Sequence, residues 1–179
     1  MSTPADVIAF WREAGPEQWF AGSDEFDDQF GQRFGAAHHA AARGEYASWL
    51  QTADGALALQ ILLDQYPRNC FRGSAHSYAT DGLALHHAHR TVDAGLDKQI
   101  EGPMRLFVYL PFEHSESLAD QNRAVTLIET LGDAGFTRFA ELHRDLIQRF
   151  GRFPHRNRAL GRESTQDELE YLASGGFAG

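Results

Sequence analysis

The apolar residues of this sequence recur every three to four positions in nearly every segment, and this period constrains the fold more than any other feature. Phe26, Phe30 and Phe34 follow one another at intervals of four, and Ala37 and Ala41 continue the stripe. Residues at this spacing lie on one face of an α-helix. No segment alternates polar and apolar residues over a useful length, and no Asn-Gly turn signals a hairpin. The sequence therefore predicts an all-α fold.

Proline, glycine and capping residues indicate where the predicted helices begin and end. Thr3 and Ser23 are typical N-cap residues, and Thr165 is followed three positions later by Glu, the spacing of a capping box. Pro67 and Pro111 are predicted to end the helices that precede them, because proline lacks the backbone N–H that continues a helix. The expected helices, seven or eight in antiparallel pairs with short links, cover residues 3–15, 23–44, 57–67, 74–95, 103–110, 117–131, 139–150 and 165–172.

Two of these helices have a recognisable inward face. In the helix over residues 117–131, the apolar positions Leu118, Val125 and Ile128 are predicted to face the core. The helix over residues 139–150 has the clearest amphipathic face in the chain. That face comprises Phe139, Leu142, His143, Leu146, Ile147 and Phe150.

Length and composition favour one globular domain. A chain of 179 residues, of which 42% are apolar and 13 are Phe, can bury a core of useful size. We expect a single helical domain over residues 1–179. The alternative is two helical lobes that meet near residues 95–115.

Several classes of protein are not expected. The first residues lack the basic start and apolar run of a signal peptide, and no stretch approaches the roughly 18 apolar residues of a membrane span. We therefore expect a cytoplasmic protein without a membrane partner. The single cysteine, Cys70, can form neither a disulfide framework nor a cysteine zinc cage within one chain. Nucleotide-binding glycine motifs are absent and the basic patch is short, so neither a cofactor nor a nucleic-acid partner is predicted.

The basic residues are distributed unevenly along an acidic chain. The net charge is −9, yet residues 149–162 hold five arginines and no acidic residue. Because like charges repel, these arginines need acidic side chains, solvent or a bound anion beside them. Arg binds a carboxylate or a phosphate through two parallel hydrogen bonds. The sequence therefore predicts an anion site, with internal ion pairs as the alternative; the acidic residues available for such pairs are Asp64, Glu113, Glu116 and Asp120.

Three polar stretches, residues 62–73, 109–121 and 143–165, lie at the ends of predicted helices. The first and the third share a pattern, because "PRN" at 67–69 and "PHRN" at 154–157 each follow an apolar helix. Arg and Asn side chains can cover the free carbonyl groups of a helix end, so capping is one interpretation of this pattern. The other is that the helix ends meet in space and share a water-accessible pocket.

The same stretches, "LLDQYPRNCFRG", "FVYLPFEHSE" and "RFGRFPHRNRALGREST", resemble the signature blocks of the bacterial and plant family called domain of unknown function 924. The similarity runs from about Phe10 to Phe177. It implies an all-helical fold similar to tetratricopeptide-repeat superhelices, and it implies no known activity. Tyr66 stands where the family pattern has Phe. The matching positions are Asp64, Gln65, Pro67, Arg68, Asn69, Arg72, Asp81, His114, Ser115, Glu116, Gln121, His143, Arg149, Gly151, Arg152, Pro154, Arg156, Asn157, Gly161 and Arg162.

Histidine and glutamate side chains in these stretches are the candidates for acid–base chemistry. His114 lies in a turn, where a ligand can reach it, and Glu116 follows closely. His143 is the other candidate, with a buried core histidine as the alternative because it lies on an apolar stripe. No metal site is predicted, since no ligand spacing is diagnostic. The alternative is a zinc, manganese or iron ion held by His114, Glu116, His143, His155 and Asp64.

We predict a small-molecule site that binds a carboxylate or a phosphate between helix ends, and we leave its catalytic status open. One alternative is a protein- or peptide-binding module of tetratricopeptide-like architecture, although no 34-residue period is visible in the sequence. The other is a purely structural network of arginines and acids. The predicted ligand-binding residues are Asp64, Gln65, Arg68, Asn69, Arg72, Gln121, Arg149, Arg152, His155, Arg156, Asn157 and Arg162.

Overall fold

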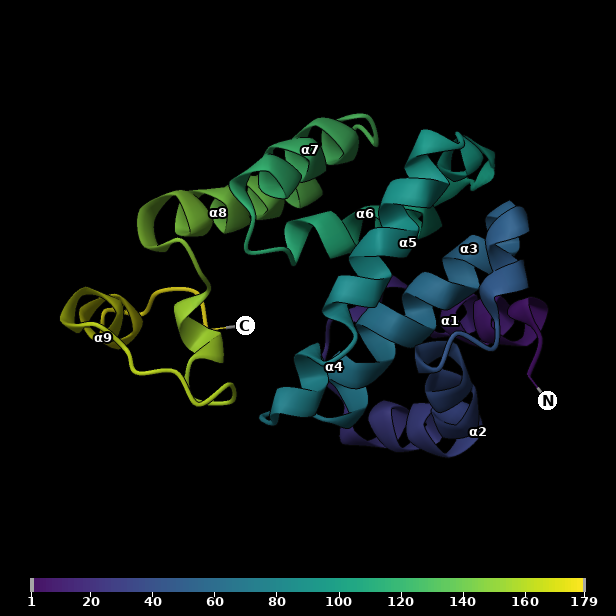
Figure 1. Ribbon diagram of the computed structural model, residues 1–179, viewed down its shortest axis with the longest axis horizontal. Coiled ribbons are helices and arrows are strands. Elements are labelled where there is room, and N and C mark those ends of the chain that lie inside the picture. Colours follow the sequence, from purple (N-terminus) through teal and green to yellow (C-terminus); the bar gives the residue numbers. More distant parts are fainter. Residues whose placement is uncertain (1, 179) are drawn as a thin grey trace.

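The computed structural model describes residues 2–178, and within this range the chain forms helices and no strand (Figure 1). Eight α-helices in this range have at least eight residues, which confirms the predicted all-α fold. None of the described helices is long and apolar enough to cross a membrane. The elements are α1 (Pro4–Trp19), α2 (Asp24–Ala42), η1 (Ala47–Gln51), α3 (Ala53–Gln60), η2 (Ile61–Gln65), α4 (Tyr66–Cys70), η3 (Ala75–Tyr78), α5 (Asp81–Asp93), η4 (Leu96–Gln99), η5 (Gly102–Arg105), α6 (Leu106–Glu113), α7 (Leu118–Glu129), α8 (Ala134–Phe150), η6 (Pro154–Arg156) and α9 (Gln166–Ala173).

Side-chain caps and glycines place several helix ends where the sequence predicts them. Thr3 and Asp6 form a capping box at the start of α1, and Thr165 and Glu168 form another at the start of α9. Gly151 has a left-handed φ of 70° and ends α8. The predicted bounds of α2, α7 and α9 are closely confirmed.

Pro67 does not end its helix, and that prediction is wrong. α3 continues through η2, a π-helical turn, into α4, and Pro67 lies in the first turn of α4. A proline clashes with the carbonyl group four residues before it, which here belongs to Leu63. The carbonyl oxygen of Leu63 accepts a hydrogen bond from the hydroxyl group of Thr80. The widened turn therefore accommodates the proline without ending the helix.

Pro111 also lies inside a helix, contrary to prediction. α6 begins at Leu106, after η5, and continues through Pro111 to Glu113. All of its residues are buried, so packing compensates for the one missing backbone hydrogen bond. The last turn is closed by the backbone N–H of His114, which donates to the carbonyl oxygen of Leu110 at 2.8 Å.

Three further boundaries differ from the sequence prediction. Ser74 caps only the short turn η3, and α5 begins later, at Asp81. α8 begins earlier than predicted, at Ala134, because the Asp133 carboxylate accepts two backbone N–H groups of the first turn. Gly15, with a φ of 73°, interrupts α1 at its predicted end, and one more turn follows.

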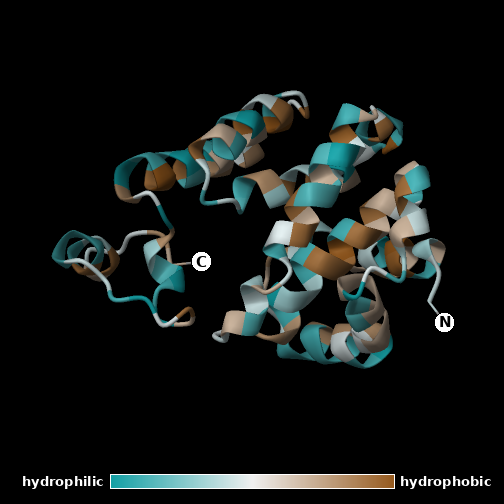
Figure 2. Cartoon of the chain, in the orientation of Figure 1, coloured by the Kyte–Doolittle hydropathy of each residue, from teal (hydrophilic) through white to brown (hydrophobic). Residues whose placement is uncertain are grey.

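Aromatic residues of α1, α2 and α6 form the centre of the core. The ring of Phe107 lies 4.9 Å from that of Trp19 and 5.2 Å from that of Trp11, in edge-to-face contacts. Phe30 and Phe34 of the predicted α2 stripe are buried against them, as expected. α3 and α6, which cross this core, are mainly hydrophobic (Figure 2).

The outer face of the α7–α8 hairpin is more exposed than the sequence predicts. The side chains of Leu118, Phe139 and Leu142 are 43%, 56% and 36% exposed, so the prediction that they face inward is wrong. α8 packs mainly against α7, and its buried residues Leu146 and Ile147 pack against Phe153, so the side that carries Phe139 and Leu142 meets solvent. Val125 and Ile128 are buried, as predicted.

α6 connects the two ends of the molecule. It packs against α5 on one side and α7 on the other, while η6 and α9 continue beyond α8 at the far end of the long axis from α1 (Figure 1). This path brings the end of α6, the start of α5 and η6 together, although they are distant in sequence.

Phe107→Ala is expected to lower the free energy of unfolding by about 3–5 kcal/mol, because it leaves a cavity among aromatic rings. Phe139→Ala removes the same ring from a position that is 56% exposed, and it should change the free energy by less than about 0.5 kcal/mol. Urea denaturation followed by tryptophan fluorescence measures both. Equal losses in the two variants would contradict the described packing.

Candidate functional site

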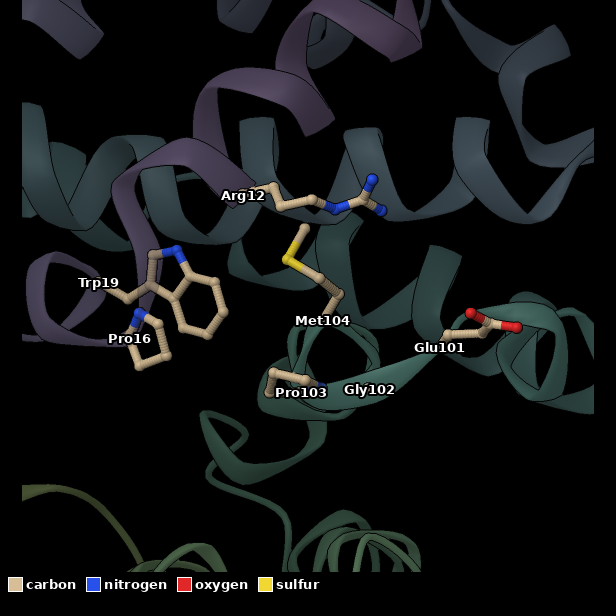
Figure 3. Close-up of a pocket in the computed structure, with 7 residues that line it drawn as sticks. All are labelled: Arg12, Pro16, Trp19, Glu101, Gly102, Pro103 and Met104. Atoms are coloured by element: carbon tan, nitrogen blue, oxygen red, sulfur yellow. The ribbon is translucent and has the colours of Figure 1, made fainter.

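A pocket of about 490 Å³ opens between α1 and η5, and few of its lining residues have polar side chains (Figure 3). Arg12 and Glu101 are the charged residues of its wall, and both are exposed. The rest of the wall is Pro16, Trp19, Gly102, Pro103 and Met104. Four of the predicted site residues, His114, Glu116, Arg156 and Arg162, line a different pocket.

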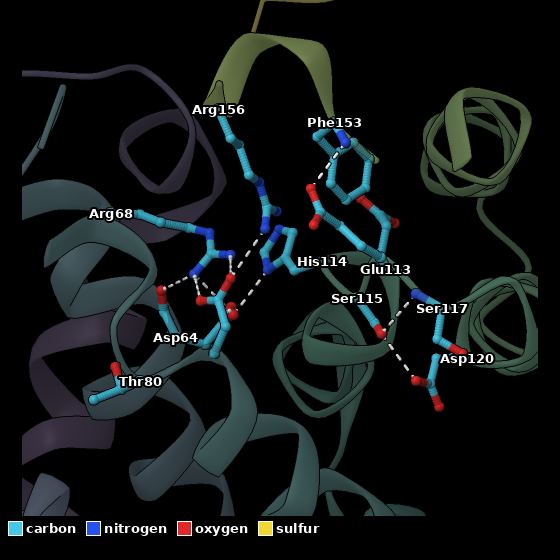
Figure 4. A network of polar contacts seen from close by, with 12 residues as sticks. Asp64, Arg68, Thr80, Glu113, His114, Ser115, Ser117, Asp120, Phe153 and Arg156 are labelled. Carbon is cyan, nitrogen blue, oxygen red and sulfur yellow. Dashed lines mark hydrogen bonds and ion pairs between the residues drawn. The ribbon is translucent and has the colours of Figure 1, made fainter. Parts of the chain in front are cut away.

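A continuous network of charged side chains connects the three polar stretches of the sequence (Figure 4). Asp64 comes from η2, Arg68 from α4, Asp81 from the start of α5, His114 from the end of α6 and Arg156 from η6. The expectation that these helix ends meet in space is correct for this set.

The carboxylate of Asp64 is fully buried at the centre of this network. Its Oδ1 lies 2.8 Å from Nδ1 of His114 and 3.1 Å from Nη1 of Arg68, and its Oδ2 accepts a hydrogen bond from Gln65 at 2.6 Å. Burial opposes ionisation, but Arg68 and His114 outweigh it and lower the pKa of Asp64 to about 2. Asp64 is therefore a carboxylate at neutral pH.

The imidazole of His114 is neutral and has one fixed tautomer. Burial lowers its pKa, and the nearby Arg68 lowers it further, while Asp64 opposes both effects. Because Asp64 is ionised and can only accept, Nδ1 of His114 carries the proton and donates it. The other nitrogen, Nε2, then has a free lone pair, and no residue of the range 2–178 forms a hydrogen bond with it.

Asp81 is shared by two arginines from distant parts of the chain. Arg68 donates to both of its oxygens, at 2.8 and 3.0 Å, and Arg156 donates to one of them at 3.1 Å. The guanidinium of Arg156 lies between the rings of Tyr78, at 4.7 Å, and Phe153, at 4.4 Å. Burial and the charge of Arg68 lower the pKa of Arg156 to about 10, so it remains protonated at neutral pH.

Glu116 attaches the segment after α8 to the rest of the molecule. Arg162 donates to its two oxygens at 2.8 Å each, and the backbone N–H of Phe153 donates at 2.9 Å. Burial opposes ionisation of Glu116, but these hydrogen bonds lower its pKa below the ordinary value. Both ends of the segment 153–162 are thus anchored on one carboxylate.

These groups surround a pocket of about 290 Å³ between the end of α6, the start of α5 and the segment 153–162. The wall contains both charged groups and apolar side chains. The lining residues are Tyr78, Asp81, Gly82, Leu85, Pro111, His114, Ser115, Glu116, Arg156, Leu160 and Arg162.

Comparison with known proteins identifies the family. Residues 7–176 match the family described as bacterial protein of unknown function, DUF924. This chain belongs to the DUF924 family. A solved structure of a protein of unknown function from Agrobacterium tumefaciens is 49% identical in sequence and matches with a TM-score of 0.93, over 96% of this chain and 97% of that chain. A comparison with curated proteins finds no match.

Glu113 and His143 form a buried pair behind the pocket of this DUF924 protein. Glu113 Oε1 lies 3.4 Å from Nδ1 of His143, whose N–H donates to the carbonyl oxygen of Phe139 at 2.8 Å. Burial and the charge of Asp64 raise the pKa of Glu113 to about 8, and burial lowers that of His143 to about 3. Both groups are therefore neutral at pH 7. His143 is a core histidine outside the pocket wall, which was its alternative interpretation.

Several predicted ligand-binding residues have partners elsewhere. Asn69 and Arg72 both donate to the carboxylate of Asp27 on α2, at 2.6 and 2.9 Å. Gln121 donates to two backbone carbonyl groups in the turn after α6 and so holds that turn in place. Gln65 donates a hydrogen bond to the carboxylate of Asp64. These four side chains position other groups and do not line the pocket.

The same holds for predicted residues near α9. Arg152 and Asn157 both donate to the carboxylate of Glu168. Arg149 stacks on aromatic rings, 4.5 Å from that of Phe150. His155 packs between aromatic rings, and its buried Nδ1 has no partner within residues 2–178. Of the arginines of residues 149–162, the pocket wall contains Arg156 and Arg162.

The structure also adds residues to which the sequence analysis gave no role. Asp81 matched the family pattern, and its place after Thr80 at a helix start was the available signal. Tyr78 lies beneath the guanidinium groups of Arg68 and Arg156, at 5.8 and 4.7 Å, and nothing in the sequence marks it.

The alternative metal set does not converge. Within the described part of the chain, no three His, Cys, Asp or Glu side chains lie close enough to hold one ion. Asp64 is paired with Arg68 and Glu116 with Arg162, so each carboxylate already has its cation.

Glu113→Gln is expected to change how stability depends on pH. The pKa of Glu113 rises from an ordinary 4.5 to about 8 on folding, so the unfolded chain loses this proton at a lower pH than the folded chain. Glu113 therefore lowers the free energy of unfolding of the wild type. This loss of stability is absent below about pH 4.5 and grows until about pH 8. The free energy of unfolding of the variant, minus that of the wild type, should rise by up to about 1.4 kcal/mol per pH unit in this window.

Chemical denaturation at several pH values measures this difference, and subtraction of the wild type removes contributions of other groups such as His143. Glu129→Gln, at an exposed position of α7, is the matched control and should give a flat difference. A flat difference for Glu113→Gln as well would show that Glu113 is ionised in the folded chain.

Proposed function

We propose that this DUF924 protein binds a small carboxylate or phosphate in the 290 Å³ pocket, with Arg156 as the binding arginine. The observation that carries the proposal is the state of Arg156. Its side chain is buried, yet it donates a single hydrogen bond, to Asp81, and its Nε has no partner within residues 2–178. A buried donor without a partner is costly, so Arg156 is incompletely paired. Its Nη2 group, which donates to no residue of the range 2–178, is the donor that an anion in the pocket would meet.

The surrounding contacts support an anionic ligand over a cationic one. The acidic groups in the wall, Asp81 and Glu116, already accept hydrogen bonds from arginine on both of their oxygens. Arg156, by contrast, retains unused N–H groups. The wall therefore offers spare donors, and these favour an incoming carboxylate or phosphate oxygen.

Among the predicted acid–base residues, His114 is the one placed for chemistry. It lines the pocket with Nε2 unpaired within the described residues, whereas Glu116 is held by Arg162 and His143 lies outside the wall. We assign His114 to ligand contact and leave the reaction, if the protein catalyses one, unassigned.

Three finer expectations are part of this proposal. The α7–α8 hairpin, packed beside α6, supports a tetratricopeptide-like stacking of helix pairs in one domain. A cytoplasmic location remains part of the proposal on the sequence alone. A peptide-binding groove is the weaker proposal, because the pocket of 290 Å³ has the size for a small molecule.

Addition of phosphate, sulfate or acetate to about 10 mM at constant ionic strength is expected to raise the melting temperature. For a Kd near 1 mM, the stabilisation is about 1.4 kcal/mol. Arg156→Gln should abolish the effect and Arg156→Lys should weaken it, because lysine keeps the charge and loses the planar fork of donors. Arg149→Gln, in the last turn of α8 and outside the pocket wall, should show the same rise in melting temperature as the wild type. An unchanged melting temperature with every anion would contradict the proposal.

The second candidate is a structural role for the network, and the sharing of Asp81 by two arginines favours it. Asp81→Asn should then lower the free energy of unfolding by about 3–5 kcal/mol, because it leaves the buried Arg156 without an ion-pair partner and Arg68 with Asp64 alone. Asp93→Asn removes a carboxylate that is 65% exposed and paired with Arg123. This change should lower the free energy of unfolding by less than about 1 kcal/mol. Similar stabilities of these two variants would rule out the structural role.

A further inference from the structure

The wall of the 290 Å³ pocket presents one hydrogen-bond acceptor next to its spare donors. The donors belong to Arg156, and the acceptor is Nε2 of His114, whose ring lies beside the Arg156 side chain (Figure 4). A simple anion uses the donors and leaves the acceptor unpaired. The site is therefore complementary to a ligand with two different polar groups.

The acceptor character of His114 is enforced by its neighbours. The buried carboxylate of Asp64 accepts from Nδ1 at 2.8 Å, and Asp64 is itself fixed by Arg68 and Gln65. If the ring adopted the other tautomer, two acceptors would face each other at that distance. Nε2 consequently presents a lone pair, and the group opposite it in a ligand must carry a hydrogen.

The charge balance of the wall favours a monoanion. Arg156 and Arg162 contribute two positive charges, and Asp81 and Glu116 contribute two negative charges. A carboxylate adds one negative charge beside Arg156, whereas a phosphate dianion adds two to a wall that is already neutral. This charge balance favours a carboxylate over a phosphate dianion.

The shape of the pocket limits the rest of the ligand. Leu85, Pro111 and Leu160 are the aliphatic residues of the wall, and they suit a short carbon chain. A volume of about 290 Å³ lies at the lower limit of ligand pockets, which run from roughly 300 Å³ upwards.

Building on the proposed function, we propose that the ligand is a small hydroxy acid, whose carboxylate pairs with Arg156 and whose hydroxyl group donates a hydrogen bond to Nε2 of His114. This assignment uses the acceptor, the spare donors and the apolar side of the pocket together. It names a ligand class that the binding of simple anions does not require.

Matched acids test the assignment, because each pair differs by one hydroxyl group at equal charge. Isothermal titration with glycolate against acetate, and with lactate against propionate, should show roughly tenfold tighter binding of the hydroxy acid, the effect of one hydrogen bond to a buried acceptor. His114→Phe should bind both members of each pair equally, because it keeps a flat ring and loses the acceptor. Arg149→Gln should retain the preference.

A second measurement on the unaltered protein covers the case in which His114→Phe does not fold. The imidazole ¹⁵N spectrum should show an unprotonated Nε2 that shifts on addition of lactate and not of propionate. Equal binding of both members of each pair, or a protonated Nε2 at pH 7, would overturn the hydroxy-acid assignment and leave the anion site intact. Absence of binding by all four acids and by phosphate and sulfate would overturn the anion site and this inference together.

Discussion

One carboxylate, that of Asp81, connects the parts of this molecule that form its pocket. It binds Arg68 from the helix before it and Arg156 from the segment after α8, so a single acidic group fixes two cations from distant parts of the chain. Two buried arginines so close to each other would repel without it. The position of Arg156 beside α5 follows from this shared pairing, while Glu116 fixes the two ends of residues 153–162 along the pocket.

The second organising feature is the contrast between charged groups that are paired and those that are not. Most arginines of the basic segment serve the fold, since Arg152 binds Glu168 and Arg162 binds Glu116. Arg156 and His114 differ from them, because each keeps polar atoms without a partner in the described residues while lining the pocket. The paired arginines thus fit the structural interpretation, whereas Arg156 is the basis of the proposed ligand site. The number of hydrogen-bond donors that have a partner distinguishes Arg156 from Arg152 and Arg162, whereas their charge is the same.

The sequence was sufficient for the helical fold, most caps and the meeting of Asp64, Arg68, His114 and Arg156, because periodicity and the family resemblance carry that information. It could not show that a π-helical turn and the hydroxyl of Thr80 let the chain pass through Pro67, since both depend on tertiary contacts. The exposed position of Phe139 was also hidden, because an amphipathic stripe does not reveal how wide the partner surface is. Likewise, residue type marked Arg72 and Arg152 as binding candidates, but only the fold shows that Asp27 and Glu168 occupy them.

The anchoring of residues 153–162 on Glu116 and Asp81 has a consequence for the order in which the protein acquires its site. Arg156 lies 75 positions after Asp81, so the aromatic core of α1, α2 and α6 can be complete on the ribosome while one wall of the pocket is still unsynthesised. Asp64 and Asp81 are then held by Arg68 and solvent until the late segment arrives. A nascent chain would gain its stability first and its recognition surface last.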